Sequence, residues 1–177
     1  PEVDFTKSEG TMTYAEYAAA ELDAPVVIET FVQAKQSWWD NKATIYTQDN
    51  EGAYFIYEMV CSEEDYAKLV PGQKIKVTGY KTEWAGEVEV GSGATFEIPE
   101  GNYVAPATDV TALLANEEEL IKKQNQFVAF KGMTVEAANE AGDAFLYNWD
   151  GSGEKGSDLY FNVSKDGKVY NFTVESY

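Results

Sequence analysis

The sequence contains no arginine and no histidine among its 177 residues. The absence of histidine excludes Ser–His and Cys–His catalysis and histidine-bound zinc. The absence of arginine removes the side chain that grips a phosphate or carboxylate with two parallel hydrogen bonds. All positive side-chain charge comes from 13 lysines against 31 Asp and Glu residues, so the formal net charge is −18.

The sequence also has a single cysteine and no long apolar run. Cys61 cannot form an internal disulfide, and it ends the apolar run 59–61, so we expect a buried free thiol. No segment approaches the roughly 18 apolar residues that a membrane-spanning helix needs. Because the chain begins at Pro1 rather than Met, we expect that an upstream segment was removed, either by processing or by the design of the expressed chain, and a secretory leader is one candidate.

The residues that are present predict a folded chain. Hydrophobic residues make up 44% of the sequence and aromatic residues 14%, which is enough to form a core. Residues 1–12 are polar and predict a tail. Thr13 and Glu16 have the spacing of a capping box, in which a hydroxyl and a carboxylate satisfy amides at a helix start, so we expect a helix over about 14–22.

The first half of the chain then predicts five strands and a second short helix. Alternation of apolar and polar residues, together with β-branched and aromatic residues, indicates the strands. Asp49–Gly52 and Pro71–Gly72 supply turns. Ser62 caps the helix, whose acidic first turn suits the helix dipole. The expected strands are 26–36, 42–48, 53–60, 74–81 and 87–90, with the helix from 62 to 69.

The segment Val70-Pro71-Gly72-Gln73-Lys74-Ile75-Lys76-Val77-Thr78-Gly79-Tyr80 resembles the turn and fourth strand of bacterial OB-fold domains. With the order β-β-β-α-β-β, residues 26–98 resemble a whole OB domain, and they are also similar to tandem OB modules of bacterial secreted and cell-surface proteins. The resemblance implies a five-stranded Greek-key barrel. One departure is that strand 26–35 lacks the glycine that often bends it, so coiling there requires a bulge.

The second half reads as an incomplete repeat of the first. Residues 144–150 parallel residues 43–49, and Tyr160-Phe161 parallels Tyr54-Phe55, at a spacing typical of duplicated domains. Asp166-Gly167 is a hairpin signal. The expected elements are a helix over 116–123 and strands over 127–137, 144–149, 159–163 and 168–177.

We therefore predict a mainly β protein with two OB-like barrels in tandem and short helices. The predicted divisions are a tail (1–12), a first OB-like domain with its N-terminal helix (13–100), a linker (101–115) and a second OB-like domain (116–177). The second domain lacks its closing helix and strands, which leaves open edges. We expect the chain to be a fragment of a longer protein, with pairing to another partner as the alternative.

Aromatic residues are the strongest candidates for ligand contact. In an OB barrel the ligand lies across strands two and three, between the first and fourth inter-strand loops. Those loops contain Trp38, Trp39 and Trp84, which predict a flat stacking platform, and the alternative is that individual rings plug the barrel or pack on its helix. The neighbouring strands add Tyr46, Tyr54 and Tyr57.

Electrostatics argues against nucleic acid, the usual ligand of this fold. Phosphate neutralisation dominates such binding, and both halves of the chain are acidic. A basic face would need several lysines to gather on one side of the barrel, whereas their alternative role is solvated edge protection. The candidates are Lys35, Lys42, Lys74, Lys76 and Lys81.

Catalytic and metal sites find little support. Residues 150–158 carry oxygen ligands at alternate positions, but they lack the sixth-position glycine and terminal glutamate of an EF-hand. Glu87 and Glu89 share a strand face, yet general acid–base catalysis needs a carboxyl with a raised pKa in a cleft. We expect no enzyme, metal or cofactor.

These arguments lead to one main prediction and two alternatives. The main prediction is a non-catalytic, extracellular binding or scaffolding module, secreted or displayed on a bacterial surface, with a glycan or protein ligand held by loop aromatics. The first alternative is a single-stranded nucleic-acid-binding OB domain. The second is a carboxylate-dependent hydrolase.

Overall fold

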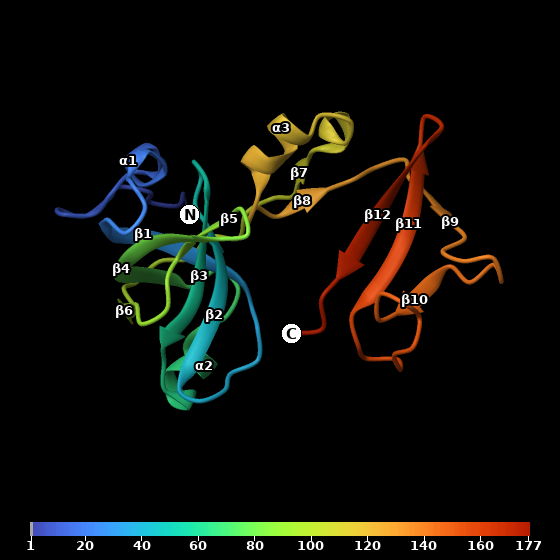
Figure 1. Ribbon diagram of the computed structural model, residues 1–177. Helices are drawn as coiled ribbons and strands as arrows, with labels where there is room; N and C mark the ends of the chain where they lie inside the picture. Colours follow the sequence, from blue (N-terminus) through green and yellow to red (C-terminus); the bar gives the residue numbers. More distant parts are fainter. Residues whose placement is uncertain (1) are drawn as a thin grey trace. The chain divides into compact units, whose positions relative to one another are not determined.

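The computed structural model describes residues 2–177, which form two compact units. Unit 1 ends at Ala129, and unit 2 comprises Phe130–Tyr177. In Figure 1, unit 1 runs from blue to yellow-orange and unit 2 is orange and red. The described chain is built mainly from strands with few short helices, as predicted, and these helices all lie in unit 1.

Unit 1 contains a closed five-stranded barrel. Its strands follow the order β1-β2-β3-β5-β4, and β4 returns to pair with β1. The β3–β5 pairing is parallel, and the other pairings in the barrel are antiparallel. This is the partly Greek-key topology of an OB-type barrel, which confirms the predicted fold of the first half. The strands are β1 (Pro25–Lys35), β2 (Lys42–Gln48), β3 (Ala53–Val60), β4 (Lys74–Trp84) and β5 (Glu87–Val90).

Bulges bend the barrel strands in place of the missing glycine. The β1–β2 register shifts between Val32 and Ala34. A second shift lies between Ala43 and Ile45 on β2, opposite Glu58, whose φ is 45°. Each extra residue increases the local twist, which is what closure of a small barrel requires. The predicted bulge in the first strand is therefore confirmed.

The barrel interior is filled by alternate residues of every strand. Ile45 pairs with Ile56 and Thr47 with Tyr54, and all four side chains are buried. Because side chains alternate across a strand, the residues between them, such as Tyr46 and Phe55, belong to the outer face. The largest fully buried side chains include Tyr54, Ile28, Ile45, Ile56, Met59, Leu69, Ile75 and Val77.

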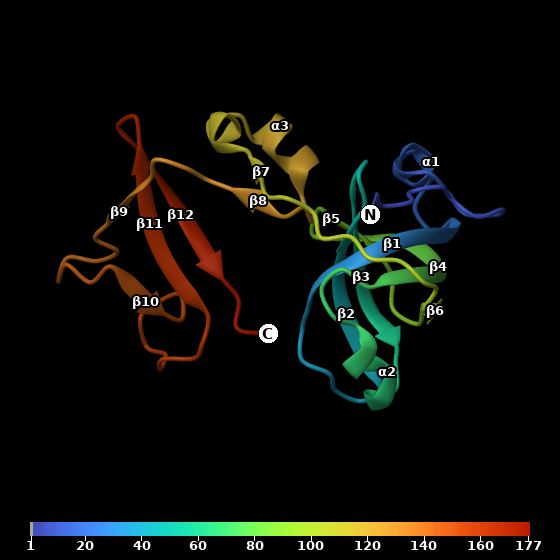
Figure 2. The ribbon, with the colours of Figure 1, turned by 180° about the vertical axis from the view of Figure 1, so that it is seen from behind.

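Two six-residue helices cover the ends of the barrel, α1 (Tyr14–Ala19) and α2 (Glu63–Lys68). Figures 1 and 2 show them at opposite ends, α1 beside the β2–β3 turn and α2 after β3. The predicted capping box of Thr13 and Glu16 is present, and the Ser62 side chain caps α2. Both helices end earlier than predicted; Ala20, for example, has ψ 141°, which is an extended conformation.

Hydrogen bonds from Lys81 on β4 connect the end of α1 to the barrel. Its Nζ donates hydrogen bonds to the carbonyl oxygens of Tyr17, Ala18 and Ala20 at 2.8–2.9 Å. Of these carbonyls, that of Tyr17 also accepts from the Ala20 amide at 3.2 Å. The ammonium group therefore adds to the capping of the C-terminal end of the helix. Burial lowers the pKa of Lys81, while the charge of Glu83 opposes this shift.

The segment after the barrel also belongs to unit 1. Residues 101–115, predicted as a linker, include a short strand and the buried residues Ala105, Val110 and Leu114. The predicted helix 116–123 consists of an α-helical and a 3-10 turn, capped by Asn116. The additional elements are β6 (Thr95–Glu97), β7 (Thr108–Asp109), η1 (Thr111–Leu113), α3 (Glu117–Leu120), η2 (Ile121–Lys123) and β8 (Val128–Ala129).

Unit 2 is a four-stranded sheet rather than a second closed barrel. Its strands are β9 (Thr134–Glu136), β10 (Phe145–Tyr147), β11 (Leu159–Lys165) and β12 (Lys168–Val174). The Asp166-Gly167 hairpin joins β11 to β12 as predicted. The single long strand predicted over 127–137 is wrong, because β8 ends in unit 1 and Gly132, with φ 70°, separates it from β9.

Candidate ligand-binding groove

The outer face of β1 and β2 carries a hollow framed by two later chain segments. On this face Ala34 lies opposite Tyr46, and Tyr46 lies opposite Phe55. The Tyr46 and Phe55 rings are 4.9 Å apart between centroids, and Gln36 Nε2 donates to the Tyr46 hydroxyl at 3.1 Å. These contacts fix a half-buried tyrosine ring at the floor of the hollow.

Gln33 on β1 holds the first framing segment, residues 103–105. Its Nε2 donates to the Tyr103 carbonyl at 3.0 Å, and its Oε1 accepts from the Ala105 amide at 2.8 Å. Both ends of the side-chain amide are therefore used to attach this segment to the barrel. An amide that donates and accepts at once can satisfy a loop backbone without adding charge.

Gln48 on β2 holds the second framing segment, residues 125–127. Gln48 Oε1 accepts from the Phe127 amide at 3.0 Å. Asn125 Nδ2 donates to the Val88 carbonyl on β5 at 3.0 Å, which anchors the other end of the segment. Backbone hydrogen bonds between β7 and the chain around β8 hold the C-terminal end of this segment in place.

The resulting hollow has a volume of about 560 Å³, which is within the range of small-molecule sites. Within the described chain its lining contains aromatic, aliphatic and amide side chains but neither a carboxylate nor a lysine. This neutrality is notable in a chain with a net charge of −18. The lining residues are Gln33, Ala34, Tyr46, Gln48, Val104, Asn125, Gln126 and Phe127, and we call this site the amide groove.

The amide groove suits a flat ring with polar edges. Tyr46 and the exposed Phe127 offer ring faces. Gln126 offers a side-chain amide, which can donate and accept hydrogen bonds at the edge of a ligand. Gln48 can add its Nε2 donor, since its Oε1 already accepts from the Phe127 amide. A lining without charge avoids the cost of burying an unpaired ion beneath the ligand.

Tyr46 is the one predicted site residue that lines the amide groove. Sequence reasoning missed the three lining glutamines and Phe127. The hydrogen bond between Gln48 and Phe127, for example, joins positions 79 residues apart. Such a contact leaves no local pattern in the sequence. The available signal was the alternation along β2, which puts Tyr46 and Gln48 on the same face.

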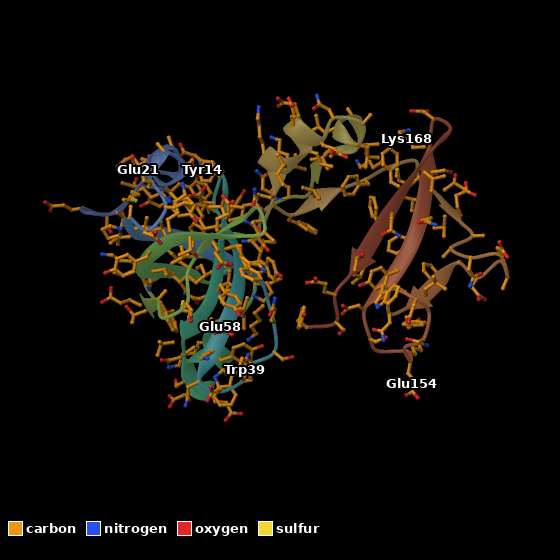
Figure 3. The ribbon with its side chains drawn as sticks, viewed as in Figure 1. Tyr14, Glu21, Trp39, Glu58, Glu154 and Lys168 are labelled. Carbon is orange, nitrogen blue, oxygen red and sulfur yellow. The ribbon has the colours of Figure 1, made fainter. Side chains whose placement is uncertain are left out.

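The predicted tryptophan platform is not assembled. Trp38 is half-buried and donates from Nε1 to the Cys61 carbonyl at 2.9 Å. Trp39 is 56% exposed beside the start of β2, at the α2 end of the barrel (Figure 3). Trp84 lies in the β4–β5 hairpin, where it pairs with Glu87 at the start of β5. Because β5 runs parallel to β3 and its last residue, Val90, pairs with Ile56, the start of β5 lies towards the start of β3, at the end of the barrel opposite α2. The three rings do not share a platform, and their contact with any ligand stays a prediction.

The two remaining predicted tyrosines differ in accessibility. Tyr54 is fully buried, and its hydroxyl donates to Asp49 at 2.9 Å. Burial raises the pKa of Tyr54, and the Asp49 charge adds to this shift. Tyr54 is therefore a core residue and offers no ring to a ligand. Tyr57 is 40% exposed on β3 and stays a candidate.

Most of the lysines considered for a basic face are engaged in contacts within the barrel. Lys74 lies 3.2 Å from Glu29, and Lys42 lies 3.5 Å from Glu58. Lys35 donates to the Tyr66 carbonyl at 2.8 Å, and its ammonium is 3.8 Å from the Tyr66 ring centroid. Lys81 is buried under α1. Any phosphate contact from these lysines would have to compete with the interactions they already make.

The carboxylates considered for catalysis do not line the groove. Glu89 is buried on β5, accepts from the Thr82 hydroxyl at 3.2 Å, and has its pKa raised mainly by burial. Neither Glu87 nor Glu89 lines the amide groove. The raised pKa of Glu89 is thus explained by its position under the barrel surface.

The acidic loop 150–158 is folded on itself. Asp150 Oδ1 accepts from the Ser152 amide at 2.9 Å and from the Ser152 hydroxyl, and these hydrogen bonds lower the pKa of Asp150. Among residues 2–177, no three acidic or cysteine side chains lie close enough together to hold a metal ion.

The Cys61 thiol and the lengths of the helices test two further expectations. Cys61 is 2% exposed, which confirms the predicted buried thiol, and burial raises its pKa to about 11. None of the helices in residues 2–177 is long and apolar enough to cross a membrane.

Comparison with known proteins finds distant likeness to solved structures. No protein-family model matches the chain, and no curated protein matches its sequence. A murine DNA-binding protein bound to double-stranded DNA matches at 12% identity, covering 85% of this chain and 73% of that one, with a TM-score of 0.40. The Ifi202 HINa domain in complex with 20-bp double-stranded DNA matches at 11% identity, covering 88% and 78%, with a TM-score of 0.39.

These comparisons correct two predictions. Both neighbours are described bound to double-stranded DNA, and on this finding the predicted extracellular glycan- or protein-binding scaffold is wrong. The prediction that charge disfavours a nucleic-acid partner is wrong on the same finding. The likeness is one of fold, so the ligand of this chain has to follow from its own groove.

Proposed function

We propose that this protein is a non-catalytic module that binds single-stranded nucleic acid through bases placed in the amide groove. The observation that carries the proposal is the uncharged aromatic and amide lining on the outer face of β1 and β2. In an otherwise acidic chain, this site lets a base approach without meeting a carboxylate in the lining. The phosphates would stay outside the hollow.

The chemistry of the lining fits a base better than a phosphate. Stacking of a base on an aromatic ring contributes about 1–3 kcal/mol and tolerates any sequence. Glutamine side chains can form two hydrogen bonds with a base edge, as they do with adenine. Tyr46 supplies a fixed ring, Gln126 supplies a side-chain amide, and Gln48 supplies its Nε2 donor.

The net charge of the chain determines how nucleic-acid binding should depend on salt. Each phosphate contact in a single strand lowers the logarithm of the binding constant by about 0.7 per tenfold increase in salt. The lysines of the barrel are largely engaged with carboxylates or carbonyls, so few such contacts can form. Because salt also screens repulsion between the acidic chain and the strand, we expect a shallow or even inverted salt dependence.

Fluorescence polarisation with labelled single-stranded oligonucleotides tests the proposal. Tyr46→Ala and Phe127→Ala should each weaken binding about tenfold, the loss expected for one stacked ring. Tyr46→Phe keeps the ring and should bind within about twofold of the original chain. Tyr80→Ala is the matched control, because Tyr80 is a 62% exposed tyrosine on β4 outside the groove. No binding at any salt concentration, low or high, or equal losses in Tyr80→Ala, would contradict the proposal.

We also propose a relationship for unit 2 and a location for the protein. Unit 2 is an incomplete second OB-like domain, supported by the parallel between residues 43–49 and 144–150 and by the antiparallel β10–β11 pairing. A longer chain that adds strands to unit 2 and raises its stability would support this proposal and the likeness to bacterial tandem modules. A secreted or cell-surface location also stays a proposal, and fractionation of the source cells tests it.

A further inference from the structure

The sheet of unit 2 has one apolar face that the unit does not bury. Successive ring contacts join Phe145 to Phe161 at 5.7 Å, Phe161 to Phe172 at 5.8 Å and Phe172 to Phe130 at 4.9 Å between centroids. Val163, on the same face, is the buried hydrophobic residue among those described in unit 2. A unit of this size cannot cover such a face alone. The same face also carries Val135, Tyr147, Leu159, Tyr170 and Val174.

Beside this face, β12 has a free edge. In the described chain β12 pairs with β11, and both β9 and β10 pair with the other side of β11. The free edge is seven residues long and contains no proline. A strand edge of this kind is a template for pairing with another chain.

The hairpin turn determines which backbone groups face outward. Asp166 and Gly167 have φ values of 51° and 79°, as a two-residue type I′ turn requires, and Lys165 pairs with Lys168. Hydrogen-bonded and non-hydrogen-bonded pairs alternate from that closing pair. The amides and carbonyls of Val169, Asn171 and Thr173 therefore point away from β11, and all three residues are exposed.

We propose that β12 pairs antiparallel with β12 of a second copy of this chain, with Asn171 opposite Asn171. In this register Val169 lies opposite Thr173, so every outward amide and carbonyl of those three residues finds a partner. Tyr170 lies opposite Phe172 on the apolar face, which becomes continuous across the two-fold axis. The edge is self-complementary, as a symmetric dimer interface must be.

The lack of charge on the free edge of β12 indicates which partner pairs with it. Between Lys168 and Glu175 the strand carries no formal charge, so it offers nothing specific to a charged partner. Two chains of −18 each repel one another, and backbone hydrogen bonds and aromatic contacts must overcome that repulsion. The dimer should consequently strengthen as salt is raised, the opposite of an interface held by ion pairs.

Sedimentation equilibrium of the full chain, without nucleic acid, tests the proposal. Asn171→Lys places two like charges directly opposite each other and should weaken the dimer at least about tenfold. Asn171→Asp should do the same. Thr134→Lys is the matched control, because it adds the same charge at an exposed position on β9, at the other edge of the sheet, and should leave the dimer unchanged.

Mixing the two variants identifies the register. Asn171→Lys and Asn171→Asp should form a heterodimer when combined, since only residue 171 faces its own counterpart. Recovery on mixing also shows that neither variant has unfolded. A monomeric original chain, an equal loss in Thr134→Lys, or no recovery on mixing would overturn the proposal. None of these outcomes depends on nucleic-acid binding.

Discussion

Unit 1 and unit 2 contain the same kinds of strand, yet they differ in closure. In unit 1 the return of β4 to β1 leaves the five barrel strands paired on both sides, and alternate side chains fill the interior. In unit 2 the strands alternate equally well, but one face stays uncovered and β12 keeps a free edge. Amphipathic strands therefore make a core only when the topology brings their apolar faces together.

The largest expected difference is in hydrogen exchange. Backbone amides of β1, β3 and β4 should open only on global unfolding of unit 1, whereas those of β11 and β12 should open locally. We expect protection in unit 1 to be at least about a thousandfold greater, measured by mass spectrometry at a concentration where the chain is monomeric. Similar protection in both units would show that unit 2 is stabilised by contacts beyond its own sheet.

The next largest expected difference is in the stability lost when a buried side chain of each unit is truncated. Ile56→Ala removes a fully buried side chain and should lower the free energy of unfolding of unit 1 by about 3 kcal/mol. Val163→Ala removes a 4% exposed side chain from a sheet with an open face and should cost only about 1 kcal/mol. Urea denaturation measures both, followed by far-UV circular dichroism and by tryptophan fluorescence, to which Trp149 contributes from unit 2 and the other three tryptophans from unit 1. Equal costs would contradict the contrast.

Acid should destabilise unit 1 through Glu29. Burial would raise the pKa of Glu29, but hydrogen bonds from Ser8 and Thr11 and the contact with Lys74 outweigh it and lower the pKa to about 2. Because the folded pKa is below the unfolded one, this stabilisation is present above about pH 5 and is lost as pH falls towards 2.

Glu29→Gln should therefore reduce stability by about 2 kcal/mol at pH 7 and flatten the loss between pH 5 and 2. Thermal unfolding across that pH range measures it. Glu2→Gln is the control, because Glu2 is an exposed glutamate in the same N-terminal segment. A parallel shift of the whole pH curve in Glu29→Gln would mean that the carboxylate does not titrate as expected.

The smallest expected effect concerns Trp38. Trp38→Phe removes the hydrogen bond to the Cys61 carbonyl but keeps a ring at the α2 end of the barrel. We expect a loss of about 1 kcal/mol in the stability of unit 1 and unchanged oligonucleotide affinity. Reduced affinity with unchanged stability would instead assign Trp38 to a ligand.

Local signals in the sequence predicted much of the fold. The Thr13–Glu16 capping box, the Asp166-Gly167 turn and the strand alternation each act within a few residues, and each is present in the structure. The short strand β6 was missed because its three residues have no pattern apart from their pairing with β4. Gly132 was read as part of a strand because a glycine alone does not reveal a positive φ.

The site was less predictable than the fold. Tyr54 and Phe55 are adjacent aromatic residues, and the sequence does not reveal which of them faces the core. The pairing of Thr47 with Tyr54 decides it, and that depends on register. The walls of the amide groove depend on contacts as distant as Gln33 with Ala105 and Gln48 with Phe127, which no short-range pattern encodes.

The way the two glutamines attach later segments has a practical consequence for dissecting the chain. A truncation after residue 100, at the predicted end of the first domain, would keep all five barrel strands and both capping helices. It would also delete Val104 and residues 125–127, and so remove both walls of the amide groove. Such a fragment could pass every test of folding and still bind nothing, whereas a cut at the Ala129–Phe130 boundary keeps the groove whole.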